Sequence, residues 1–259
     1  GALLWIVYWL LSASKLPRGS IWHAYVLLLG VAGGLVTALV GAQALLWRGL
    51  VHLLGDPMPF VTWFEWPQAV AALLIGALVW WYHRDLLDAT SRTPLHRVYQ
   101  YLVSGIGAIA AAAGVGLLVV SLVDAITPAQ LYHDPINTLL GAATLIIVGA
   151  PLWWSHWRLA QRATEQHPEV ELTAVPRRIY LIVLLGAAVI TVVIALIAAV
   201  AEIIADVMEN QLSLTTLYNT RTEIGYLTAG LTIIAYHAAV LRQDSRNAPA
   251  KPEATDAPA

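Results

Sequence analysis

The sequence of 259 residues contains no cysteine, and charged residues make up only 12% of it. The lack of cysteine excludes disulfides, thiolate metal ligands and a cysteine nucleophile. The scarcity of charge is matched by 59% hydrophobic residues, which is more apolar surface than a soluble domain of this length can bury in one core. The composition therefore predicts a membrane protein.

The sequence also lacks the common motifs of enzymes and of nucleic-acid-binding modules. It has no phosphate-binding glycine loop, no His-Glu-x-x-His zinc motif, no nucleophile elbow and no basic-aromatic strand. Its aromatic residues are strongly biased, with 11 Trp and 10 Tyr against two Phe, and Trp and Tyr favour the boundary between lipid and water. We therefore expect a protein that is not an enzyme and that has no nucleic-acid partner.

Seven apolar stretches predict an all-α, multi-pass transmembrane bundle of about seven membrane helices, without β-sheet. They cover residues 2–13, 22–54, 67–87, 93–126, 134–162, 176–210 and 220–242. The first is too short to span a membrane, so the chain reads as one that begins inside a helix. Residues 244–259 are rich in Pro, Ala and charge, which predicts a disordered cytoplasmic tail.

Three landmarks recur along the chain and indicate internal repeats. Glycines at positions 76, 149 and 230 and histidines at positions 83, 156 and 237 recur with identical steps, and tyrosines at positions 25, 99 and 180 recur with nearly the same steps. Each repeat is predicted to be a pair of helices, a shorter one that ends in Trp and His and a long one that starts at the Tyr. The units of this transmembrane domain, residues 1–243, then lie near 1–54, 67–126, 136–210 and, incomplete, 220–243.

The basic residues predict the orientation of the chain. Of the 14 Lys and Arg residues, 12 fall on one side of the predicted spans, and only Arg48 and Arg221 fall on the other. Because basic loops stay in the cytoplasm, we expect these loops and the C-terminus on the cytoplasmic side of a bacterial inner membrane.

Two segments carry a resemblance to a known family. They are residues 149–158 (GAPLWWSHWR) and residues 97–104 (RVYQYLVS), within the repeated helix pairs. In these features the chain resembles a bacterial multi-pass integral-membrane domain family of unknown function, which has tandem helix-pair repeats and is common in Chloroflexus-type bacteria. The resemblance implies fold and membrane localisation, and it brings no site residues with it.

The recurring histidines allow two interpretations. His83, His156 and His237 lie near the same end of three helices, where they could supply axial ligands to a haem b held in the bundle. Alternatively, each lies at the level of the lipid headgroups beside its tryptophans and hydrogen-bonds there. A Soret band in the purified protein would distinguish haem from the second interpretation, which needs no cofactor.

Three acidic residues form a second candidate site. Glu202, Asp206 and Glu209 lie on one face of the sixth predicted span, a spacing that could hold a metal cation or relay protons. Since Glu202 lies about 36 Å of helical rise from the basic start of that span, the alternative is an exposed acidic helix end outside the hydrocarbon core.

The span centres contain almost no ionisable residues, which argues against ion-coupled transport. We therefore expect a non-enzymatic scaffold or subunit of a membrane assembly, whose partners are membrane lipids and other membrane protein subunits. The alternative is a small-molecule or ion transporter that uses the interface between repeats. That function requires a cavity near the middle of the membrane, reached by polar groups.

Overall fold

The computed structural model describes residues 7, 19–55, 65–87, 93–127 and 135–247, and no strand occurs in these ranges. The predicted all-α class is confirmed. Apart from Val7, the first predicted stretch lies outside the described residues, as do residues 248–259 of the predicted tail.

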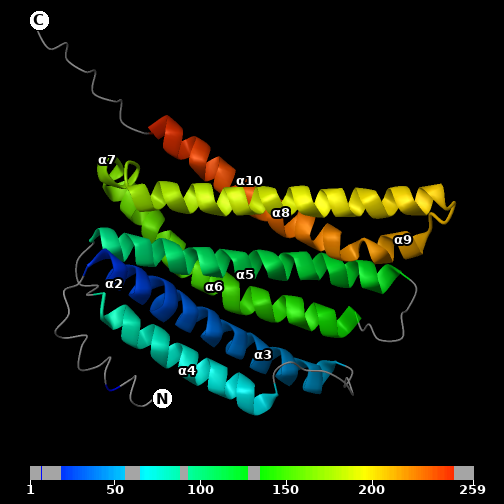
Figure 1. Cartoon of the computed structure of the whole chain (residues 1–259), viewed down its shortest axis with the longest axis horizontal. Helices are drawn as coiled ribbons and strands as arrows, with labels where there is room; N and C mark the ends of the chain where they lie inside the picture. The colour runs from blue at the N-terminus through cyan, green and yellow to red at the C-terminus, as the bar shows by residue number, and fades with distance from the viewer. Residues whose placement is uncertain (1–6, 8–18, 56–64, 88–92, 128–134, 248–259) are drawn as a thin grey trace, which may run out of the picture.

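The helices lie roughly alongside one another in an elongated bundle (Figure 1). They are α2 (Ser20–Tyr25), η1 (Val26–Gly33), α3 (Gly34–Leu54), α4 (Trp66–Asp85), α5 (Pro94–Ile126), α6 (Pro135–Gln166), α7 (Pro168–Glu171), α8 (Val175–Met208), α9 (Leu214–Asn219) and α10 (Arg221–Asn247). The first three form one continuous helix.

Five of these helices are long and apolar enough to cross a membrane. They are Ser20–Leu54, Pro94–Ile126, Pro135–Gln166, Val175–Met208 and Arg221–Asn247. Helix α4 is not among them, although a span was predicted there, because its 20 residues include polar and aromatic residues at both ends.

Close backbone contacts join each long helix to the shorter helix that follows it. A Cβ atom added to Gly34 would lie 2.6 Å from the backbone nitrogen of Trp80, and one added to Gly107 would lie 2.5 Å from that of Trp153. The two contacts are equivalent, because the same step along the chain separates the two glycines and the two tryptophans. In the third pair, a Cβ added to Gly230 would lie 2.5 Å from a side-chain methyl of Val192 and 3.1 Å from the carbonyl oxygen of Ala188. Three helix pairs result, namely α2–η1–α3 with α4, α5 with α6, and α8 with α10.

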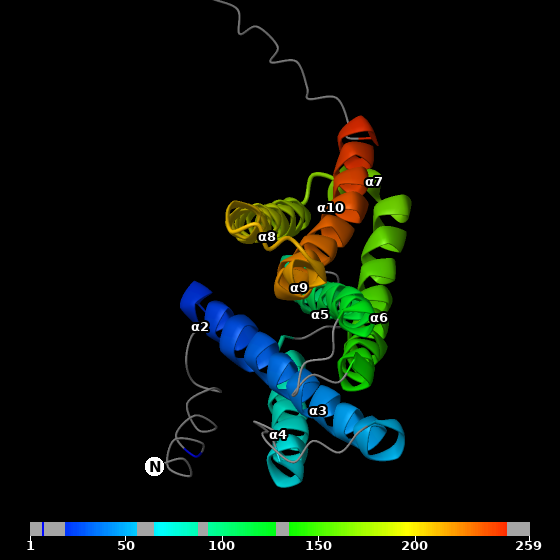
Figure 2. The ribbon, with the colours of Figure 1, turned by 90° about the vertical axis from the view of Figure 1, so that its right-hand side faces the viewer.

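The packed pairs are therefore shifted by one helix from the units near 67–126 and 136–210. Those units join a shorter helix to the long helix after it, whereas the glycine contacts join it to the long helix before it. Helix α5 lies near the centre, and both α6 and α10 pack against it (Figure 2). At the far end of α5, Arg221 Nε lies 2.9 Å from Asp124 Oδ1, which ties the second pair to the third.

The eight residues of η1 form a π-helix, and the sequence contains its cause. Nine positions separate Tyr25 from Gly34, whereas eight separate Tyr99 from Gly107 and Tyr180 from Ala188. A π-turn closes its hydrogen bonds five residues apart and so accommodates one extra residue. The insertion is therefore absorbed in η1, and the helix before and after it keeps the register of the other pairs.

Deletion of Leu29 should accordingly convert η1 into α-helix with little loss of stability, within about 1 kcal/mol of the wild type. Deletion of Val183, which is equally exposed at 63%, should rotate the start of α8 by about 100° and abolish its contacts. Thermal unfolding in detergent, followed by circular dichroism, would compare the two. Equal losses for both deletions would contradict the assignment of an inserted residue.

Helix α10 extends three residues beyond the predicted start of the tail at Asp244. Helix α10 continues to Asn247, because Asp244 forms an ion pair with Arg177 at the start of α8. This contact gives the last turns of α10 a tertiary partner, which the sequence composition does not reveal.

Candidate functional site

The repeated tyrosines and histidines meet as three Tyr–His pairs, one in each helix pair. Tyr25 packs on His83, Tyr99 on His156 and Tyr180 on His237, with ring centroids 6.2, 6.1 and 5.7 Å apart. In each case the tyrosine lies near the start of the long helix and the histidine near the end of the shorter one. Gly30 makes room for the first pair, because a Cβ there would overlap the ring of His83.

The hydrogen bonds of the histidines fix the roles of their ring nitrogens. Each Nδ1 lies close to the carbonyl oxygen four residues earlier, at 2.8 Å for His83, 3.0 Å for His156 and 3.1 Å for His237. Since a carbonyl only accepts, Nδ1 carries the proton and Nε2 of the neutral ring is an acceptor. At His237 the hydroxyl of Tyr180 donates to Nε2 over 3.0 Å, so the nitrogen that would bind a haem iron is already engaged.

The third Tyr–His pair belongs to a larger aromatic cluster, formed by Tyr101, Trp153, Trp157, Tyr180, Tyr236 and His237. Trp157 lies at its centre and is only 1% exposed. Its indole Nε1 donates to the hydroxyl of Tyr236 over 2.6 Å. The cluster joins α5, α6, α8 and α10, so its rings act as packing between two helix pairs.

Arg177 lies beside this cluster and is 1% exposed. Its guanidinium donates to both carboxylate oxygens of Asp244, at 2.6 and 2.8 Å. It donates further to Gln161 Oε1 at 2.8 Å and to Thr164 Oγ1 at 3.0 Å, and its Cζ lies 5.5 Å from the ring centre of Trp157. Two hydrogen bonds to one carboxylate and further ones to neutral oxygens satisfy the donors of this buried guanidinium, so Arg177 has a structural role.

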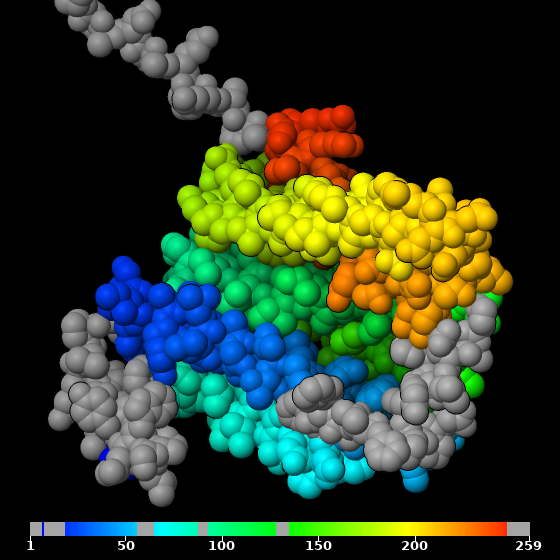
Figure 3. All heavy atoms as spheres, turned by 45° about the vertical axis from the view of Figure 1, so that its right-hand side comes forward, coloured from blue at the N-terminus to red at the C-terminus, as the bar shows by residue number. Residues whose placement is uncertain are grey.

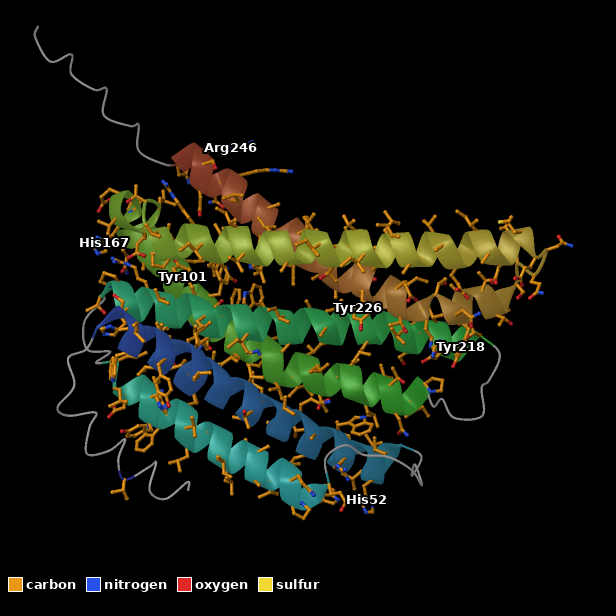
Figure 4. The ribbon with its side chains drawn as sticks, in the orientation of Figure 1. His52, Tyr101, His167, Tyr218, Tyr226 and Arg246 are labelled. Carbon is orange, nitrogen blue, oxygen red and sulfur yellow. The ribbon has the colours of Figure 1, made fainter. Side chains whose placement is uncertain are left out.

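Both ends of the bundle carry such charged contacts. Figure 4 places Tyr101, His167 and Arg246 at the end where Arg177 lies, and Tyr218 at the end where α9 meets α10. Near the first end, Arg97 Nε donates to Glu171 Oε1 over 3.0 Å and so ties α5 to the short helix α7. The ion pairs thus join helices to one another.

Two apolar hollows flank α8. One of about 480 Å³ lies between α5, α8 and α10, and only Thr191, Thr222 and Tyr226 contribute polar side chains to its wall. The Thr191 hydroxyl already donates to the carbonyl of Ala187 in its own helix. The other, of about 790 Å³, lies between the first halves of α5 and α8 and reaches Tyr101 and Tyr180. In Figure 3, α5 forms the floor between α8 and the first long helix.

The acidic candidates Glu202, Asp206 and Glu209 do not form one cluster. Asn219 Nδ2 donates to Glu202 Oε1 over 3.3 Å, Thr216 donates to Asp206 Oδ2, and Glu209 is exposed. Two of the three thus hold α9 against the end of α8. Within the described residues, no group of three or more His, Asp or Glu side chains could hold a metal ion.

His83 and His237 are buried inside the bundle, so their side chains do not face the surface. His156 is half-buried. Sequence reasoning did not assign roles to Tyr180, Arg177 and Asp244. A signal for the first was present, since the tyrosine precedes its histidine by nearly the same interval in all three pairs. No comparable signal exists for Arg177 and Asp244.

The fold defines a class of all-helical proteins with five candidate membrane spans, some of them joined by buried ion pairs and hydrogen bonds. The chain matches the domain of unknown function DUF5671 over residues 97–236, which is more than half of its length. It therefore belongs to this family. The match covers the second helix pair and most of the third. Comparison with curated proteins gave no match, and comparison with solved structures gave none either.

Proposed function

We propose that the protein is a non-enzymatic scaffold or subunit of a membrane assembly, without a cofactor, in a bacterial inner membrane. The observation that carries this proposal is the use of its buried polar groups. Arg177 with Asp244, Asp124 with Arg221, and Tyr180 with His237 each join two helices. Such contacts fix the packing of helices in lipid, which is what a scaffold requires.

The orientation proposed from the basic residues fits the same picture. Apart from Arg48 and Arg221, the arginines of the described residues gather at one end of the bundle, where α5 and α8 begin and where α4, α6 and α10 end. We place this end in the cytoplasm. The exposed side chains of α8 are apolar along most of its length, which suits contact with lipids or with other membrane proteins.

Extraction in a mild detergent followed by native mass spectrometry tests the proposal. We expect masses above the 28.0 kDa of one chain, either as multiples or with a further protein bound. Dissociation of the same sample in a harsh detergent is the control, because it should leave the monomer alone. A solitary monomer already in the mild detergent would refute a subunit role.

A second candidate function is transport of a small apolar molecule. The hollow of about 480 Å³ favours it, because this hollow lies at the interface between the second and third helix pairs. Its few polar side chains suit an apolar substrate better than an ion. Uptake of apolar fluorescent probes into vesicles that contain the protein would test this function.

A further inference from the structure

A second type of contact recurs between neighbouring helix pairs. In the first instance Gln43 of α3 donates to Thr144 of α6 over 3.5 Å. In the second, a Cβ on Gly116 of α5 would lie 2.5 Å from the carbonyl oxygen of Gly225 of α10. Gln43 lies nine residues after Gly34, and Gly116 lies nine residues after Gly107. Thr144 lies five residues before Gly149, and Gly225 lies five residues before Gly230.

The same spacing, applied to the third helix pair, identifies a position on α8 that has no such contact within the described residues. Nine residues after Ala188 lies Ile197, which is 65% exposed. It lies two residues from both Ala195 and Ala199, which are buried, so it points away from α10 by about 160°. Ile190 and Ile204, one heptad before and after it, are exposed too. We name Ile190, Ile197, Ala201 and Ile204 the α8 end face.

The complementary surface is found on α4, in the first helix pair. Five residues before Gly76 lies Ala71, the equivalent of Thr144 and Gly225. Ala71 is exposed, as are Gln68 and Ile75 one turn to either side. We name these three residues the α4 end face. Helices α4 and α8 lie on opposite sides of the bundle (Figure 2), so the two end faces of one chain cannot meet each other.

We propose that the α4 end face of a second copy of this chain seats on the α8 end face of the first, and so continues the series of helix pairs. Both halves of the interface are present on one chain, and the same type of interface occurs twice within it. A small residue at position 71 allows close approach of the helices, as Thr144 and Gly225 do. The contact is heterologous, since different surfaces meet, and it extends head to tail.

This inference rests on the proposed function, because it names the partner of the assembly. Cysteine cross-linking in native membranes tests it, since the chain has no cysteine of its own. Two differently tagged copies, one with Ile197→Cys and one with Ala71→Cys, are expressed together and treated with a short thiol-reactive cross-linker. The matched control replaces Ile197→Cys by Leu196→Cys, which is 51% exposed and lies about 100° around the helix.

We expect a cross-linked dimer of the two tagged copies, at about ten times the yield of the control, because thiol cross-linking needs close Cβ atoms. A single chain with both Ile197→Cys and Ala71→Cys should form a ladder of higher species. A Gln43→Cys and Thr144→Cys variant, cross-linked within one chain, verifies that this type of contact is within reach.

Four results would overturn the inference. Equal yields from Ile197→Cys and Leu196→Cys would show that the contact is not specific to the α8 end face. Efficient cross-linking of Ile197→Cys to itself would indicate a symmetric dimer. Absence of a cross-link while native mass spectrometry shows a larger assembly would refute this interface and leave the proposed function standing. Absence of a cross-link together with a solitary wild-type monomer would refute both.

Discussion

Replacement of Gly107 by leucine should force α5 and α6 apart and lower the midpoint of thermal unfolding by about 5–10 °C, from overpacking of about 1–3 kcal/mol. The reason is the closeness of the two backbones. Any Cβ at this position would lie 2.5 Å from the nitrogen of Trp153 and 3.0 Å from the carbonyl oxygen of Gly149. Backbone atoms cannot move aside as a flexible side chain can. Thermal unfolding in detergent, followed by tryptophan fluorescence, measures the loss.

Gly186→Leu is the matched control. Gly186 also lies in a long apolar helix, α8, but a Cβ there would meet nothing within 4 Å. Its replacement should leave the midpoint unchanged or raise it slightly, because leucine favours helix more than glycine does. A similar loss in both variants would show that the stability depends on glycine composition and not on the contact between α5 and α6.

These glycine contacts show how far the sequence could predict the fold. The identical steps between glycines and between histidines predicted repeated helix pairs, because equivalent residues occupy equivalent places in each pair. The steps do not say whether a shorter helix packs on the long helix before it or after it, since both choices give the same spacing. Glycine contacts such as that of Gly107 with Gly149 resolve the choice.

The tyrosine steps contained information that the prediction did not use. The step from Tyr25 to Tyr99 is one position longer than the step from Gly76 to Gly149. One position of difference looks negligible at the level of the repeat, yet it rotates a helix by about 100°. A π-turn is the local solution to this mismatch, and η1 provides it.

The candidate site was located more accurately than it was interpreted. Residues 153–158 and the recurring histidines lie in the second halves of α4, α6 and α10. Depth along a helix follows from sequence position, but the direction of a side chain around the helix depends on its neighbours. Trp157 and His237 therefore turned out to be buried, whereas Trp154 of the same segment is exposed, in keeping with an interfacial aromatic residue.

The contact of Arg177 with Asp244 is the second place where a large loss is expected. Asp244→Ala should lower the free energy of unfolding by about 3 kcal/mol, because it leaves a guanidinium buried without its carboxylate. Arginine cannot relieve this by losing its proton, and Gln161, Thr164 and Tyr101 offer only neutral oxygens. The last turns of α10 should then detach from α8. Limited proteolysis of this segment, together with the unfolding midpoint, measures both effects.

The double variant with Arg177→Met and Asp244→Ala separates a buried charge from a lost contact. With the guanidinium gone, its loss of stability should be smaller than that of Asp244→Ala alone, since an apolar side chain is tolerated at a buried site. Arg178→Ala, at the exposed neighbouring position, is the control for removal of one positive charge, and it should have almost no effect. If Arg177→Met lowered the stability of the Asp244→Ala variant by as much as it lowers that of the wild type, the two residues would act independently. The length of α10 would then depend on helix propensity alone.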